Sequence, residues 1–219
     1  PLTDACPKPL LDVAGTPLIG WHLKRLAQSG ITQIVINHAW LGRMIEDQLG
    51  SGTDYGVEIV YSAEGTALET AGGIARALSL LGGEPFLVVS ADIFCAYDFS
   101  RLLPVAEQMR RDPHGLAHLV LVPNPAHHPD GDFGLQDGKA CPENGQRMTF
   151  SGIALYQPDL FLGVDPNRPA RIAPLLKAAA AQGRVTAESF DGLWLDVGTV
   201  ARLDEARRCA QPIDGMAVR

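Results

Sequence analysis

The feature that most constrains the fold is an alternation of short apolar segments with amphipathic ones. Residues 31–37 (ITQIVIN), 57–62 (VEIVYS) and 85–92 (PFLVVSAD) have the length and β-branched content of buried strands. Between them, residues 39–50 (AWLGRMIEDQLG) and 67–81 have the apolar spacing of helices. Strands that alternate with helices predict an α/β domain with a mainly parallel sheet.

The remainder of the chain continues this alternation. Thr16 before Pro17 predicts an N-cap with proline at the first helical position. Asp191-Gly192 predicts a turn that joins a short strand pair. Further strands are expected over residues 116–123 and 148–156, and further helices over 18–29, 98–111, 172–182 and 199–209. With no repeat or linker in view, we expect one domain over residues 1–210 and a C-terminal tail over 211–219.

Composition excludes several classes of function. The chain has 219 residues, 46% of them hydrophobic, and a formal net charge of −7. This acidic balance argues against a nucleic-acid or anionic-membrane partner, and no apolar stretch approaches the ~20 residues that span a bilayer. The four cysteines lie far apart, which predicts reduced thiols and a cytoplasmic protein.

Two aspartates follow apolar strands directly. Asp92 ends the run PFLVVSAD, and Asp196 ends the run LWLD before Gly198-Thr199 and a helix. Open parallel sheets place their sites at the carboxyl ends of strands, and two carboxylates there could chelate Mg²⁺. Either aspartate could instead cap the segment that follows it. Together they predict a metal site.

Three other segments carry candidate chemistry. Lys8 stands between two prolines that favour an extended backbone, a mount that suits a lysine binding phosphate as a point charge. Gly72 and Gly73 lie near a helix start, where a ligand could approach the backbone, although tight packing explains such glycines equally well. His127 and His128 match no standard zinc spacing, so their segment is expected to be a polar surface loop.

These segments together resemble a known family. PLTDACPKPLLDVAGTPLI, ETAGG, VSAD and WLDVGT look like the corresponding motifs of the sugar-1-phosphate nucleotidylyltransferases. Within that family, YSAEGTALETAGG, NPAHHPDGDFGL and TFSGIALY look most like the N-acetylmuramate α-1-phosphate uridylyltransferases. The resemblance covers residues 1–210 and implies a Rossmann-like three-layer α/β/α nucleotidyltransferase fold with a mixed, mainly parallel sheet.

The resemblance also implies roles for individual residues. Lys8 matches a phosphate-contacting lysine with a catalytic role, and Asp92 and Asp196 match two catalytic aspartates that bind Mg²⁺. Positions that match the nucleotide site, besides Lys8, are Glu64, Glu69, Thr70, Gly72 and Gly73, and positions that match the sugar pocket are Gly134, Ser151 and Gly152.

Two departures from the family pattern stand out. The family usually has glycine before the metal-binding aspartate, where this chain has Ala91, which would be strained if that position needs a positive φ. A first strand and a Gly-rich triphosphate-binding loop are expected ahead of Pro1. We expect such a loop to order on nucleotide binding. The residues from Pro1 onward are not expected to bind UTP normally without it.

The reaction that the resemblance implies is UTP plus N-acetylmuramate 1-phosphate giving UDP-N-acetylmuramate and pyrophosphate, with Mg²⁺ and a monomeric protein. Two alternatives stay open. One is transfer to another sugar 1-phosphate, such as glucose or mannose 1-phosphate. The other is a non-catalytic subunit that senses nucleotide sugars.

Overall fold

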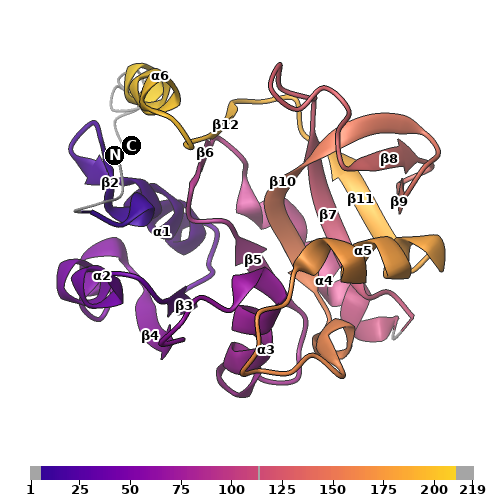
Figure 1. The fold of residues 1–219 in the computed structure, drawn as a ribbon, viewed down its shortest axis with the longest axis horizontal. Helices are drawn as coiled ribbons and strands as arrows, with labels where there is room; N and C mark the ends of the chain where they lie inside the picture. Colours follow the sequence, from indigo (N-terminus) through magenta and orange to yellow (C-terminus); the bar gives the residue numbers. More distant parts are fainter. Residues whose placement is uncertain (1–5, 113, 211–219) are drawn as a thin grey trace.

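Six helices surround the strands of this protein in a computed structural model that describes residues 6–112 and 114–210 (Figure 1). The α-helices are α1 (Leu18–Gln28), α2 (Gly42–Leu49), α3 (Glu69–Leu81), α4 (Leu102–Arg111), α5 (Ile172–Ala181) and α6 (Val200–Ala210). Single 3₁₀ turns are η1 (Lys8–Leu10), η2 (Thr53–Tyr55), η3 (Phe99–Arg101) and η4 (Pro158–Phe161).

The strands form one large sheet and three strand pairs. They are β1 (Asp12–Val13), β2 (Thr16–Pro17), β3 (Gln33–His38), β4 (Glu58–Ala63), β5 (Phe86–Val89), β6 (Ile93–Cys95), β7 (Ala117–Val122), β8 (Phe133–Gln136), β9 (Lys139–Cys141), β10 (Gln146–Tyr156), β11 (Val185–Ser189) and β12 (Trp194–Asp196). The large sheet has the order β5-β10-β7-β11-β9-β8, with a further pairing of β10 to β8. The separate pairs are β1–β2, β3–β4 and β6–β12.

The mixed α/β class that the sequence predicts is confirmed, but parallel pairing is less extensive than expected. Only β3–β4 and β7–β11 pair in parallel among the described strands. The long strand β10 runs antiparallel to both β5 and β7. The physical reason is the connection between β7 and β10, which returns through the β8–β9 hairpin rather than through a crossover helix.

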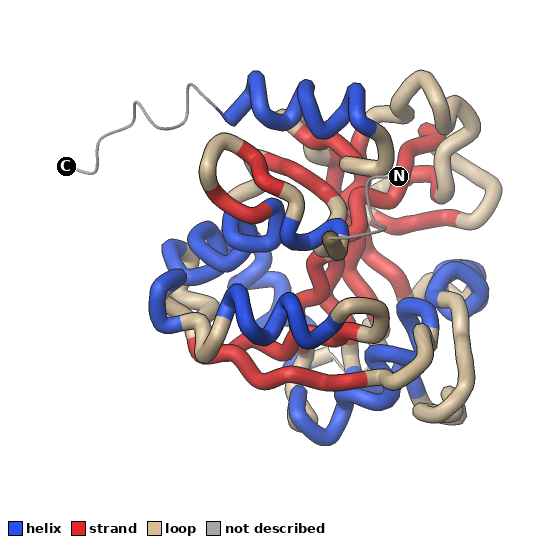
Figure 2. The backbone as a smooth tube through the Cα atoms, turned by 60° about the vertical axis from the view of Figure 1, so that its left-hand side comes forward, coloured by secondary structure: helices blue, strands red, loops and turns tan. Residues whose placement is uncertain are grey.

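Side-chain alternation along β7 divides the core into two layers. Leu119 and Leu121 face a core that includes residues of α3 and α5. Val120 faces the opposite side, in a core with Leu102 and Met109 of α4. Since successive side chains of a strand point to opposite faces, a fully buried strand requires cover on both sides. The result is the three-layer α/β/α arrangement (Figures 1 and 2).

The last described helix packs on the first elements of the chain. Helix α6 lies beside the β1–β2 pair in Figure 1, and its Leu203 and Ala206 share a buried cluster with Val13 and Trp21. The Trp21 indole N–H donates to the Val13 carbonyl at 3.0 Å, and Arg207 Nε donates to the Asp12 carbonyl at 3.0 Å. These contacts tie the two ends of residues 6–210 together.

Two local predictions are wrong. Thr16 does not cap α1, because it pairs with Val13 in the β1–β2 hairpin, and Pro17 takes the N-cap position without a side-chain hydrogen bond. Asp191-Gly192 does not join a strand pair, because β11 pairs with β7 while β12 pairs with β6. In both cases the segment pairs with a strand that the local turn and capping signals did not predict.

The remaining elements lie close to their expected places. The sequence did not predict β6, nor did it predict β8 and β9 in the segment before β10. The expected C-terminal tail, residues 211–219, lies outside the described residues. Within the described ranges, no helix combines the length and apolar character that crossing a bilayer needs.

Candidate active site

The β6–β12 pair brings Asp92 and Asp196 together. Asp196 lies opposite Ile93 in the ladder, and the Val197 N–H donates to the Asp92 carbonyl at 2.7 Å. Both aspartates line a cleft of about 420 Å³, which Thr70 of α3 and the Ser151-Gly152 step of β10 also line. Two carboxylates that lie far apart in the sequence therefore face one cavity.

Lys8 lies next to the first of these carboxylates. Its Nζ is 3.6 Å from Asp92 Oδ2, and both side chains are about half exposed, at 41% and 50%. The expected extended backbone is wrong here, because Lys8 begins the 3₁₀ turn η1, which the Leu10 N–H closes by donating to the Pro7 carbonyl at 2.9 Å. An open ion pair of this kind adds little stability. The lysine can therefore contribute its charge to a ligand at little cost.

Asp196 is engaged by two basic side chains. Arg202, in the first turns of α6, forms an ion pair with Asp196 Oδ1, and His127 Nε2 lies 3.0 Å from Asp196 Oδ2. Arg202 Nη1 also lies 2.9 Å from His127 Nε2. Arg202 Nε donates to Thr199 Oγ1 at 3.2 Å, which anchors the guanidinium beside the carboxylate.

The chemistry of these residues fits a hard divalent cation. Asp92 and Asp196 are 50% and 36% exposed, so their oxygens can be reached by an ion and its waters. Mg²⁺ commonly binds through one or two carboxylates and takes its other ligands from water and phosphate. Among the described residues no group of three or more acidic, His or Cys side chains forms an all-protein cage. The pair therefore fits a cation that keeps ligands from outside the protein.

The expected nucleotide-site residues cluster around the start of α3. Glu64 Oε2 accepts from the Leu68 N–H at 2.9 Å, and a Cβ on Gly73 would collide with the same carboxylate. A Cβ on Gly72 would lie 2.5 Å from the Arg168 carbonyl oxygen. Both glycines therefore permit close packing in this structure.

The same helix start has little free hydrogen-bonding capacity. The Ala71 and Gly72 N–H groups donate to the Ala170 carbonyl at 2.9 and 3.2 Å. Glu69 opens α3 with φ of 59° and pairs with Arg171 at 3.7 Å. Thr70 is the member of this group that lines the cleft. Any ligand here would meet side chains more readily than helix N–H groups.

Ser151 and Gly152 form a bulge in β10 that reaches the cleft. The register with β7 shifts between Phe150 and Ile153. The Ser151 hydroxyl is buried and donates to the Val120 carbonyl at 2.6 Å, while the Ser151 carbonyl accepts from the Trp194 indole at 2.9 Å. The bulge thus locks β10 to the strand that carries Asp196.

Gly134 does not lie with these two residues. It sits in β8, paired with Cys141 and Arg147, and is not among the residues that line the cleft. A Cβ at this position would collide with the Asn144 carbonyl, so close backbone approach accounts for the glycine.

Ala91 is not strained. Among the described residues, the non-glycine positions with positive φ are Ala14, Leu41, Glu69 and Asp137, and Ala91 is not one of them. Alanine at the position before Asp92 is therefore compatible with the local backbone.

Sequence reasoning missed His127 and Arg202. The loop that carries His127 was expected to be a plain surface loop, yet it folds against the cleft. Asn124 fixes it, accepting from Thr149 Oγ1 at 2.9 Å and donating to the Pro129 carbonyl at 2.9 Å. The weak signal for Arg202 was its place shortly after a strand-end aspartate; His127 had none, because only the tertiary fold brings it to Asp196.

His22 lies buried behind the site. Its Nε2 lies 2.8 Å from the Ile93 carbonyl, next to Asp92, and its Nδ1 has no hydrogen-bond partner among the described residues. Burial lowers the pKa of His22 to about 4 from 6.5. The imidazole is therefore neutral at pH 7 and donates its Nε2–H to Ile93.

This burial predicts a pH-dependent loss of stability. The unfolded chain binds a proton below pH 6.5 that the folded chain resists down to about pH 4. Stability from this group is thus complete above pH 6.5 and is lost as the pH falls toward 4, with a drop of about 2 kcal/mol between pH 7 and 5. Urea denaturation at pH 7 and at pH 5 measures the loss of unfolding free energy between the two. This loss should be smaller in His22→Gln than in the wild type by about 2 kcal/mol. The exposed control His114→Gln should show the same pH dependence of the unfolding free energy as the wild type. An unchanged pH dependence in His22→Gln would contradict the role of His22.

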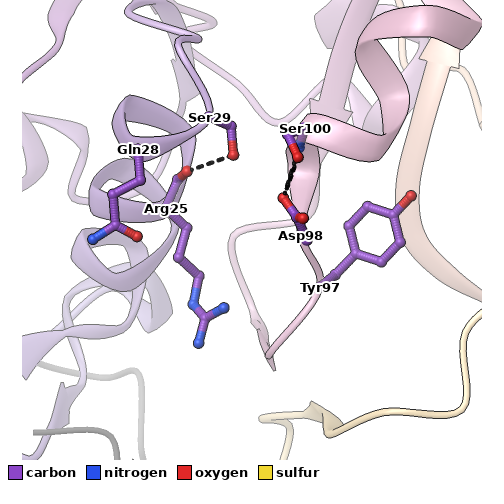
Figure 3. A pocket seen from close by; sticks show the side chains of 6 residues that line it. All are labelled: Arg25, Gln28, Ser29, Tyr97, Asp98 and Ser100. Carbon is purple, nitrogen blue, oxygen red and sulfur yellow. Dashed lines mark hydrogen bonds between the residues drawn. The ribbon is translucent and has the colours of Figure 1, made fainter. Parts of the chain in front are cut away.

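A second hollow, of about 230 Å³, lies between the end of α1 and the segment before α4 (Figure 3). Arg25, Gln28 and Ser29 line one side, and Tyr97, Asp98 and Ser100 line the other. Asp98 is already satisfied by the Ser100 hydroxyl at 2.6 Å and the Ser100 N–H at 3.0 Å. This hollow shares no lining residue with the cleft of Asp92 and Asp196.

The fold and the cleft define an α/β protein with two carboxylates that face one cleft and a lysine that pairs with one of them. A profile of the family described as "Nucleotidyl transferase" matches residues 1–137. The chain therefore belongs to the nucleotidyl transferase family, as its motifs predict.

Individual relatives agree with this assignment. The chain is 56% identical to N-acetylmuramate alpha-1-phosphate uridylyltransferase of Neisseria meningitidis serogroup B, over 96% of this chain and 92% of the relative. It is 31% identical to the protein of the same name from Caulobacter vibrioides, over 90% and 86% of the two chains. A solved Bacillus anthracis structure, assigned as a glucose-1-phosphate thymidylyltransferase, matches with a TM-score of 0.81 at 24% identity, over 96% and 89% of the chains. At that identity, the last likeness concerns the fold alone.

Proposed function

We propose that this protein transfers a uridylyl group from UTP to N-acetylmuramate 1-phosphate, giving UDP-N-acetylmuramate and pyrophosphate. The single observation that carries the proposal is that Asp92 and Asp196 line one cleft while Lys8 pairs with Asp92. The names and coverage of the Neisseria and Caulobacter relatives support the choice of substrates.

The proposed reaction needs no general base. The nucleophile is a phosphate oxygen of the sugar phosphate, which is already ionised at neutral pH. It forms a bond to the α-phosphorus of UTP as the bond to the β-phosphate oxygen breaks, and pyrophosphate leaves with that electron pair. The difficulty is to bring two anions together, so catalysis depends on position and charge.

The chain's own residues supply the positioning and the charge that this reaction needs. Lys8 would place a positive charge beside Asp92, where the α-phosphate would lie, and would offset charge as the two anions approach. Asp92 and Asp196 would hold Mg²⁺ between them. When bound, this ion supplies charge neutralisation and aligns phosphate oxygens. The fixed β6–β12 ladder sets the separation of the two carboxylates before any ligand arrives.

The surrounding residues would recognise the substrates. The nucleotide would meet the start of α3, with Glu64, Glu69, Thr70, Gly72 and Gly73 as its proposed neighbours. The sugar would lie toward the bulge of β10, at Ser151 and Gly152, with Gly134 as a more distant member. Residues 1–210 would act as one nucleotidyltransferase domain, as the packing of α6 on Val13 and Trp21 supports. A monomer and a cytoplasmic location remain our expectations.

A pyrophosphate-release assay tests the function. Full-length protein with Mg²⁺ and UTP should release pyrophosphate with N-acetylmuramate 1-phosphate and much less with glucose 1-phosphate or mannose 1-phosphate. Greater release with either of those sugars would keep the chemistry and overturn the substrate. Tight binding of UDP-N-acetylmuramate without turnover would favour a sensing subunit instead.

A further inference from the structure

Both oxygens of the Asp196 carboxylate are already engaged without any ligand. Arg202 holds Oδ1 and His127 holds Oδ2. Asp92 has its own cation in Lys8, so two carboxylates and two permanent cations form a balanced group. A divalent cation on Asp92 and Asp196 would therefore compete with these two basic groups for the Asp196 carboxylate.

The contacts among Asp196, His127 and Arg202 cannot all be hydrogen bonds at once. A neutral His127 with hydrogen on Nε2 donates to Asp196, and then Arg202 Nη1 has no acceptor on the ring nitrogen 2.9 Å away. With Nε2 unprotonated, the ring accepts from Arg202 and faces the carboxylate with a lone pair. This conflict favours movement of the guanidinium.

Arg202 is built to pivot rather than to leave. Its Nε donates to Thr199 Oγ1 at 3.2 Å and its backbone N–H lies 3.3 Å from the same oxygen. Arg202 Nη1 can therefore break its contact with Asp196 while Nε and the backbone N–H stay at Thr199. The guanidinium is always charged and has a planar set of donors that matches phosphate oxygens.

Resting on the function proposed above, we propose that Arg202 is a switchable anion-binding residue. Without a divalent cation it pairs with Asp196. When the cation takes Asp196, the guanidinium turns to a phosphate oxygen of the bound substrate. Cation and phosphate then bind cooperatively. The cation frees Arg202 from Asp196, and the phosphate holds Arg202 away from Asp196. This arrangement would disfavour cation binding to the empty enzyme.

Direct binding of Mn²⁺, followed by its electron paramagnetic resonance, tests the switch without reference to turnover. In Arg202→Gln, Mn²⁺ alone should bind about 5-fold tighter or more than in the wild type, because a competitor for Asp196 is gone. Adding inorganic phosphate should tighten Mn²⁺ binding to the wild type by a similar factor but change Arg202→Gln little. Arg202→Lys, which keeps the charge without the planar fork, should give intermediate values.

The control is Arg208→Gln, an exposed position on the same helix with the same change in charge. It should bind Mn²⁺ as the wild type does. Equal tightening in Arg208→Gln would assign the effect to net charge and overturn the switch. Unchanged or weaker Mn²⁺ binding in Arg202→Gln would also overturn it, and if that variant does not fold, Arg202→Lys decides by the same criterion. Because Mn²⁺ and inorganic phosphate are the probes, this failure is distinct from failure of the uridylyl transfer assay.

Discussion

Replacing Asp92 or Asp196 by asparagine should lower kcat for pyrophosphate release by at least about 100-fold, the scale of losing one preorganised electrostatic contact. Asparagine keeps the size of the side chain but removes the charge that would hold Mg²⁺. Since the backbone of both residues is fixed in the β6–β12 pair, the fold should be retained. Steady-state kinetics measure the loss of kcat, and Mn²⁺ binding on the same preparations measures the loss of metal affinity.

The control for this pair is Asp47→Asn, an exposed carboxylate on α2. It should leave both kcat and Mn²⁺ binding unchanged. Turnover near the wild-type rate in either site variant would remove that aspartate from the mechanism. Loss of turnover with normal Mn²⁺ binding would keep its importance but contradict its role as a metal ligand.

Gly152→Ala should destabilise the fold substantially. Gly152 has φ of 82°, and a Cβ there would lie 2.5 Å from Ser90 Oγ and 2.7 Å from Ser90 Cβ. The left-handed backbone and the overpacking together should lower the free energy of unfolding by about 2–4 kcal/mol. Because the Ser90 N–H donates to the Gly152 carbonyl at 2.8 Å, just before Asp92, kcat should also fall by about 10-fold.

Gly163→Ala separates the two causes. Gly163 has φ of 87°, but a Cβ added there would meet nothing within 4 Å, so its substitution should cost only the backbone part, about 1–2 kcal/mol. Its kcat should match the wild type. Urea denaturation and kinetics on both variants measure these differences, and equal costs at the two glycines would show that the contact with Ser90 is unimportant.

Local signals predicted most of the elements. The amphipathic spacing of residues 67–81 indicated a helix that the structure begins at Glu69, and PFLVVSAD indicated a strand followed by an exposed carboxylate. These predictions succeed because hydrophobic periodicity reports burial within one element. Thr16-Pro17 failed because the same residues could also pair with Asp12 and Val13, and pairing prevailed.

The site divides in the same way. Lys8, Asp92 and Asp196 are predicted as site residues from the sequence, because each stands in a motif that is contiguous in the chain. Arg202 and His127 could not be assigned to the site, since their shared partner Asp196 is reached through α6 in one case and through the 124–132 loop in the other. Tight packing of Gly72 and Gly73 was an open alternative in the sequence, but their partners Arg168 and Glu64 could not be predicted.

The sequence by itself therefore determined the α/β class, the family motifs and the identity of two carboxylates at strand ends. Only the tertiary structure decided that β6 and β12 pair, that α6 returns to the first helix, and that Arg202 and His127 meet Asp196. The physical reason is that periodicity and turn chemistry act within a few residues. Strand pairing and ion pairs between distant residues depend instead on how the whole chain packs its buried surfaces.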